Sequence, residues 1–139
     1  MEPFISAERT LTRTDHVRLS RLLDKQRGTF SGAEAMQDVL ESSELVASPA
    51  VPPTVVTMHT QVLLQDPQRD APPYRLTLCY PDRAEPAQGF VSVLSPLGTA
   101  LLGLHAGEIA RWRKPDGSWG AARIVAVLFQ PEASGDYQS

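Results

Sequence analysis

Three prolines in one short segment, Ser48-Pro49-Ala50-Val51-Pro52-Pro53, constrain this 139-residue chain more than any other feature. Proline fixes φ and lacks a backbone donor, so neither a helix nor a central strand can continue through the segment. Apolar residues recur at helical spacing before it and mainly alternate after it. We therefore expect an α+β protein with two regions, residues 1–50 and 54–139, that meet at this segment.

The first region has the spacing of two amphipathic helices. The apolar positions are Val17, Leu19, Leu22 and Leu23, followed by Met36, Val39, Leu40, Leu45 and Val46. Thr12 or Thr14 can cap the first helix, in whose opening turn Asp15 places negative charge, and Ser31 with Glu34 has capping-box spacing for the second. A connection as short as residues 27–30 favours antiparallel neighbours, so we expect a short, coiled-coil-like helical hairpin.

The second region is rich in strand signals. Alternating or β-branched runs occur at residues 56–64, 74–80, 90–94, 109–113 and 122–129. Lys114-Pro115-Asp116-Gly117 connects the last two runs and predicts a β-hairpin. The final run is apolar at both alternating sets of positions, which predicts a central strand with both faces covered.

One segment of the second region departs from strand spacing. Ser95 is a favoured helix cap, Pro96 suits the first helical position and Gly103 suits a stop, so residues 95–103 predict a single short helix. Its leucines share one face that can cover the sheet, which leaves the entry Leu94-Ser95-Pro96 at the surface.

Composition narrows the classes of partner and compartment. The net charge of −3, from 13 basic and 16 acidic residues, lacks the cationic excess of a phosphate-backbone binder, so we expect no direct, sequence-specific nucleic-acid binding. The apolar run among the first residues is too short for a secretion signal, and no later apolar run has the length of a membrane span. We therefore expect a cytoplasmic protein with no membrane contact, in which the single cysteine, Cys79, is a packing residue.

A search for catalytic motifs finds none, and we expect neither enzymatic activity nor a cofactor. His16, His59 and His105 lack metal-ligand spacing, and there is no nucleophile elbow, phosphate-binding loop or dinucleotide fingerprint. Asp24 and Glu34 can approach each other at the hairpin tip, but neighbouring basic residues would neutralise a magnesium site there, and we predict no metal. We expect Trp112 and Trp119, which flank the β-hairpin, to pack across strands.

Two runs of sequence resemble the C-terminal domain of the bacterial Gre transcript elongation factors. They are Val55-Val56-Thr57-Met58-His59-Thr60-Gln61-Val62 and Val91-Ser92-Val93-Leu94-Ser95-Pro96-Leu97-Gly98-Thr99-Ala100-Leu101-Leu102-Gly103-Leu104, and the resemblance covers most of residues 54–130. The ending Phe129-Gln130-Pro131-Glu132-Ala133-Ser134-Gly135-Asp136-Tyr137, with the short hairpin, is more similar to a Gre-like branch, the regulators of nucleoside diphosphate kinase.

This resemblance implies a fold and a partner. The fold is an FKBP-like, strongly bent antiparallel sheet with one short helix, and the partner is RNA polymerase, bound at the mouth of its secondary channel. The stretch that matches Leu94, Ser95 and Pro96 contributes to that contact in the family, although many members carry a polar or acidic residue where this chain has Leu94. The resemblance therefore implies that Leu94, Ser95, Pro96 and Leu97 form the centre of a partner-binding surface.

The hairpin departs from the family pattern. Gre factors place acidic residues at the tip of a long coiled coil, whereas the first helix here, from about Thr14 to Gln26, spans only about 20 Å at the usual helical rise. Asp24 and Glu34 are therefore poor replacements for those acids. We expect a polymerase-binding regulator that does not stimulate transcript cleavage and competes with Gre factors. The alternatives are an active cleavage factor using the acidic tip and, by fold analogy alone, a prolyl isomerase.

Overall fold

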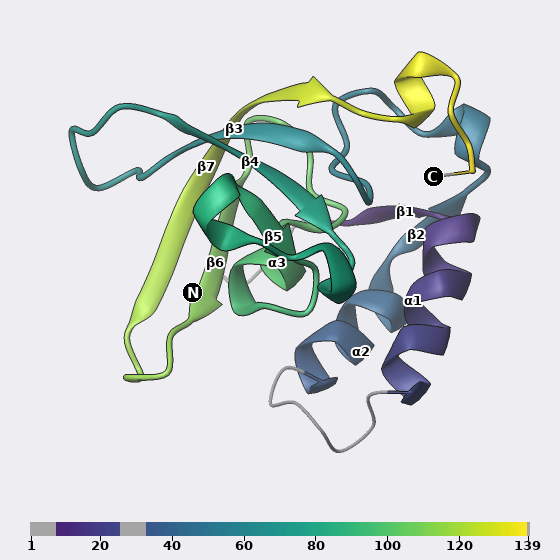
Figure 1. Ribbon diagram of the computed structural model, residues 1–139, viewed down its shortest axis with the longest axis horizontal. Helices are drawn as coiled ribbons and strands as arrows, with labels where there is room; N and C mark the ends of the chain where they lie inside the picture. The colour runs from purple at the N-terminus through teal and green to yellow at the C-terminus, as the bar shows by residue number, and fades with distance from the viewer. Residues whose placement is uncertain (1–7, 26–32, 139) are drawn as a thin grey trace.

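The computed structural model describes residues 8–25 and 33–138, which form an α+β fold (Figure 1). In chain order the elements are β1 (Thr10–Thr12), α1 (Arg13–Lys25), α2 (Ala33–Ser42), β2 (Glu44–Val46), β3 (Gln61–Gln65), β4 (Tyr74–Cys79), β5 (Phe90–Ser92), α3 (Pro96–Leu101), β6 (Ile109–Arg113) and β7 (Trp119–Phe129). Helices α1 and α2 lie side by side at one end of the molecule, and the curled sheet with α3 forms the rest. No helix in these described ranges is long and apolar enough to cross a membrane.

The larger sheet has the strand order β5-β4-β3-β7-β6. All neighbouring strands are antiparallel except β4 and β5, where Thr77 pairs with Phe90 and Cys79 with Ser92 in parallel. The expectation of a wholly antiparallel sheet is therefore wrong at this edge. Two 3-10 turns between β4 and β5 bring the chain back beside the middle of β4, so it enters β5 in the same direction.

The predicted β-hairpin, formed by β6 and β7, and the short helix α3 are confirmed, but β7 is only partly as expected. It lies between β3 and β6, as a central strand should, yet Val125, Leu128 and Phe129 are 42%, 41% and 48% exposed. The prediction that both faces are covered is wrong because the hydrophobic core lies on the face that carries Ala122 and Ile124. An antiparallel sheet can leave its other face to solvent.

The predicted strand around Val56 and Met58 is absent. Residues 55–58 are all buried, and their backbone is paired irregularly: the Val56 N–H donates to Leu104 O at 2.9 Å, and the His59 N–H donates to Leu78 O at 2.8 Å. His59 has a φ of 68°, which breaks any extended ladder. Apolar alternation over so few residues does not distinguish a strand from a buried loop.

The N-terminal region contains a second, smaller sheet that the helical spacing did not predict. β1 and β2 are parallel, with Leu11 beside Leu45, so the assignment of Leu45 and Val46 to a helix is wrong. Thr12 does cap α1, since its Oγ1 accepts the Asp15 N–H at 3.0 Å. Residues 26–32, including Ser31 of the expected capping box and the turn of the expected hairpin, lie outside the described residues.

One hydrophobic cluster joins the two regions of the chain. Leu11, Leu19 and Met36 belong to the same buried cluster as Leu78 and Leu102. The N-terminal helices therefore pack on the sheet region across the proline segment, and their position relative to α3 is set by shared core contacts. The division into two domains and the FKBP-like topology stay predictions.

Candidate partner-binding groove

The entry to α3 is held by a local hydrogen-bond network. Ser95 Oγ accepts the Gly98 N–H at 3.1 Å and donates to Ser92 O at 2.6 Å, while the Leu94 N–H donates to Ser92 Oγ at 3.0 Å. Pro96 occupies the first turn, where a backbone donor is not needed. The cap predicted from the sequence is confirmed, and it fixes the backbone on both sides of Pro96.

Burial divides the four predicted contact residues. Pro96 is exposed, whereas Ser95 is half-buried, and Leu94 and Leu97 are partly buried against the hydrophobic core. The exposed ring of Pro96 and the accessible part of Leu94 form the outward surface of this segment. Leu97 chiefly anchors it.

Gly98 lets α3 approach β5 closely. A Cβ at this position would overlap the carbonyl oxygen of Ser92, a backbone atom that cannot move aside as a flexible side chain does. Thr99 adds a buried hydrogen bond from its Oγ1 to Val93 O at 2.6 Å. The glycine of the Ser-Pro-Leu-Gly segment is therefore required by packing.

The other end of α3 is held by Arg9. Its Nη1 donates to the carbonyl oxygens of Thr99, Ala100 and Leu102 at 3.1, 3.1 and 2.7 Å. These carbonyls lie at the negative end of the helix, where a cation is favourable. Burial lowers the pKa of Arg9, and the nearby carboxylate of Glu108 opposes that shift. Arg9 could not be predicted from the sequence because its partners lie 90 to 93 residues away along the chain.

A groove of about 630 Å³, which we call the α3 groove, includes two of the predicted contact residues in its lining. Leu94 and Pro96 contribute from the α3 entry, Asp38 from α2, and Trp112 and Trp119 from β6 and β7. Arg9 also lines the groove, so four separate parts of the chain build the site. The contributions of α2 and of the β6–β7 hairpin were not predicted, because they depend on tertiary packing.

The two tryptophans have different environments. Trp112 is half-buried and lies directly against Gly120, where a Cβ would overlap the indole ring. Trp119 is 63% exposed, and Arg113 Cζ lies 5.4 Å from its ring centroid. The prediction that both pack is confirmed for Trp112 and wrong for Trp119, which starts β7 on the solvent side of its alternation.

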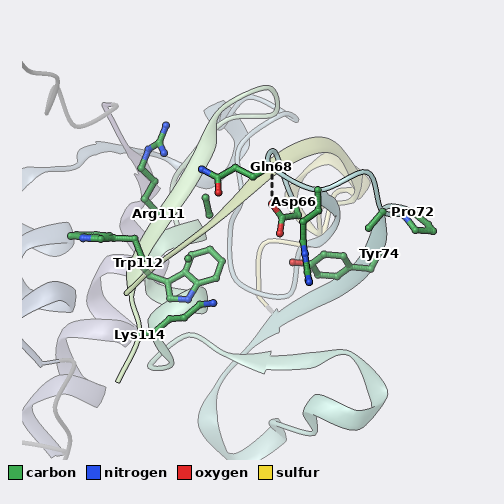
Figure 2. Close-up of a pocket in the computed structure, with 12 residues that line it drawn as sticks. Asp66, Gln68, Pro72, Tyr74, Arg111, Trp112 and Lys114 are labelled. Atoms are coloured by element: carbon green, nitrogen blue, oxygen red, sulfur yellow. Dashed lines mark hydrogen bonds between the residues drawn. The ribbon is translucent and has the colours of Figure 1, made fainter. Parts of the chain in front are cut away.

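A second depression of about 760 Å³, the β6 hollow, shares Arg111, Trp112 and Trp119 with the groove. Figure 2 shows Asp66 and Tyr74 on one side of it and Trp112 with Lys114 on the other. The Gln68 N–H donates to Asp66 Oδ1 at 2.8 Å and closes the turn after β3. Partial burial, with the charge of Asp66, raises the pKa of Tyr74.

Asp24 and Glu34, the acids predicted at the hairpin tip, do not belong to the α3 groove. Asp24 near the end of α1 and Glu34 at the start of α2 are exposed, and neither lines the α3 groove. Among residues 8–25 and 33–138, no group of three or more His, Cys, Asp or Glu side chains is arranged to hold a metal ion.

Comparisons with known proteins show which family the chain is similar to. Residues 51–128 match the family model "Transcription elongation factor, GreA/GreB, C-term". The chain is 32% identical over 105 residues to the regulator of nucleoside diphosphate kinase of Escherichia coli K12, covering 76% of each protein. It is 41% identical over 63 residues to the transcription elongation factor GreA of Solidesulfovibrio magneticus, covering 45% of this chain and 38% of that one.

A solved structure extends the match to the fold. The prokaryotic transcription elongation factor GreA/GreB from Nitrosomonas europaea is 33% identical and superimposes with a TM-score of 0.73, covering 88% of this chain and 100% of that one. The likeness therefore includes most of the N-terminal region as well as the sheet. The chain belongs to the GreA/GreB family of transcription elongation factors.

Proposed function

We propose that this protein is a transcription regulator that binds RNA polymerase at its secondary channel through the α3 groove, without stimulating transcript cleavage. GreA/GreB factors bind RNA polymerase, which supports the choice of partner. The observation that carries the choice of site is the rigid presentation of Leu94 and Pro96, with Ser95 and Gly98 holding one end of α3 and Arg9 the other.

The chemistry of the α3 groove suits a protein partner. Leu94, Pro96 and the two tryptophans supply apolar and aromatic surface, and charged side chains such as Asp38 lie beside them. Aromatic residues framed by polar groups are typical of protein interfaces. Pro96 presents a ring with little conformational freedom to lose when a partner binds.

The absence of cleavage stimulation is inferred from the reach of the helices. α1 has 13 residues, about 20 Å at the helical rise, and α2 has 10. Asp24 is followed at once by Lys25, and Glu34 lies in the first turn of a different helix. A factor of this length is suited to occupying a docking site, and the expected consequence is competition with longer Gre factors.

Binding is tested by capturing core RNA polymerase on the immobilised protein. We expect Leu94→Arg to weaken binding about tenfold or more, because it places a charge on an apolar contact, and Pro96→Ala to weaken it about threefold. Leu128→Arg and Pro86→Ala are matched controls, since Leu128 is 41% exposed on β7 and Pro86 begins a different exposed turn. Equal affinity for all four variants and the unmodified protein would remove the α3 groove from the proposal.

The regulatory mode is tested with stalled elongation complexes and magnesium. We expect no change in transcript length when the protein is added alone, and a loss of Gre-stimulated cleavage as it is titrated against a Gre factor. Shortened transcripts that disappear with Asp24→Asn or Glu34→Gln would instead establish the active cleavage factor.

A further inference from the structure

We propose that the β6 hollow is a binding site for a nucleoside phosphate, in which a nucleobase stacks on aromatic side chains while the phosphates contact Lys114, Arg111 and Arg69. The inference does not rest on the proposed polymerase binding and concerns the free protein, although the hollow shares Arg111, Trp112 and Trp119 with the α3 groove. Its size is suitable, since about 760 Å³ lies within the range of small-molecule sites.

The balance of charge in the hollow is opposite to that of the chain. Three cations, Arg69, Arg111 and Lys114, line it with one carboxylate, Asp66, whereas the whole protein carries −3. Guanidinium and ammonium groups are the usual partners of phosphate oxygens. Figure 2 shows Arg111 and Lys114 both on the β6 side, with the Arg111 guanidinium pointing away from Lys114, so the two cations would contact different phosphates.

Aromatic side chains complete the chemistry. Tyr74, Trp112 and Trp119 all line the hollow, and Tyr74 and Trp119 are 45% and 63% exposed. Every nucleobase has a π-face that stacks on such rings, and stacking contributes about 1–3 kcal/mol per base by alanine substitution. Aromatic rings beside cations therefore favour a base-carrying phosphate over inorganic phosphate or an acidic peptide.

The hollow is built from segments that hydrogen bonds hold in place. The Gln68 N–H donates to Asp66 Oδ1 at 2.8 Å, and Gln65 Nε2 donates to Ala71 O at 3.3 Å across the same connection. On the other side, Gly120 leaves room for the Trp112 indole. Asp66 is placed as the acceptor for a ribose hydroxyl or a base amino group.

Intrinsic tryptophan fluorescence can report binding, because the two tryptophans of the sequence, Trp112 and Trp119, both line the hollow. The unmodified full-length protein is titrated with ATP while tryptophan fluorescence is recorded, and the affinity is confirmed by calorimetry. Adenosine and inorganic tripolyphosphate are titrated in parallel. We expect quenching by ATP and an affinity at least about tenfold above that of either fragment.

Variants locate the site. Lys114→Gln is expected to weaken ATP binding about fivefold and Tyr74→Ala about as much, because one removes a phosphate contact and the other a stacking surface. Arg123→Gln is the matched control, since Arg123 is an exposed cation of β7 that does not line the hollow. Circular dichroism of each variant separates a lost ligand contact from misfolding.

Several results would overturn the proposal. Tripolyphosphate binding as tightly as ATP would reduce the hollow to a nonspecific cation cluster. Binding of a single-stranded oligoribonucleotide without any binding of ATP would assign it to another ligand. No heat and no quenching at millimolar ATP, or equal losses for Arg123→Gln and Lys114→Gln, would dismiss the site. None of these outcomes bears on polymerase binding, which is measured separately.

Discussion

The two ends of the N-terminal helix pair differ in how they are held. At the root, Arg9 and Asp15 are tied by hydrogen bonds to α3 and to the Met58 backbone. Toward the tip, Asp24 and Glu34 are exposed. The long-range hydrogen bonds at the root therefore help to position α3, which lies beside the α3 groove.

Gly98→Ala is expected to cause the largest loss of stability, because Gly98 belongs to α3, the helix that Arg9 contacts at the root. Its Cβ would overlap the Ser92 carbonyl and push α3 away from β5, at a cost of about 3 kcal/mol or more in the free energy of unfolding. Urea denaturation measures the loss. Gly107→Ala is the control, because Gly107 has a φ of 96° but open space around it, so only backbone strain of about 1 kcal/mol is expected. Equal losses would contradict the steric explanation.

Asp15, at the root of the helix pair, makes the stability of the fold depend on pH. Its side chain is 3% exposed, its Oδ2 accepts the Met58 N–H at 3.1 Å, and burial raises its pKa to about 6, opposed by that hydrogen bond. Because the folded-state pKa lies above the ordinary value of 3.8, the folded protein retains this proton to a higher pH than the unfolded chain does. The contribution of Asp15 to stability is therefore full below about pH 4 and is lost as the pH rises to about 6.

Asp15→Asn removes this titration. A shift of about two pKa units corresponds to roughly 3 kcal/mol, so the variant should gain that much relative to the unmodified protein between pH 4 and pH 7. Urea denaturation at four pH values in this range gives the difference. Parallel stability curves for the two proteins would show that Asp15 does not titrate there.

Arg9→Met tests the far end of α3. The change removes three hydrogen bonds to helix carbonyls while keeping an apolar stem, and we expect a loss of about 2 kcal/mol. Polymerase affinity should fall with it, because the α3 groove is then less rigid. Arg13→Met, at an exposed position at the start of α1, is the matched control. A loss no greater than that of the control would remove Arg9 from the positioning of α3.

The tip should show the smallest effect. The double variant Asp24→Asn, Glu34→Gln changes two exposed residues, so a stability change below about 0.5 kcal/mol and unaltered polymerase binding are expected. Denaturation and polymerase capture check both. A large loss of binding would mean that the tip takes part in docking and that the contrast between root and tip does not hold for function.

Local rules predicted much of the fold. The Ser95 cap, the short α3 helix and the Lys114–Gly117 turn are predicted from residues a few positions apart, and each is found in the structure. For α1 the sequence offers Thr12 or Thr14 as the cap, and the structure has Thr12. The candidate contact residues Leu94 and Pro96 came from sequence as well, through the family resemblance. These features depend on backbone geometry and nearby hydrogen bonds, which a short stretch of chain specifies by itself.

Four further features of the fold depend on tertiary packing and could not be predicted from local sequence. The pairing of β1 with β2, the parallel entry of β5, the exposure of Trp119 and the contacts of Arg9 all join or separate residues far apart in the sequence. Helical spacing could not distinguish Leu45 in a helix from Leu45 in a strand, because the partner that settles it, Leu11, lies 34 positions earlier. Sequence determined the family, the helix caps and the β6–β7 hairpin, while packing determined the β1–β2 pair and the α3 groove, because the groove walls come from segments that only the folded core brings together.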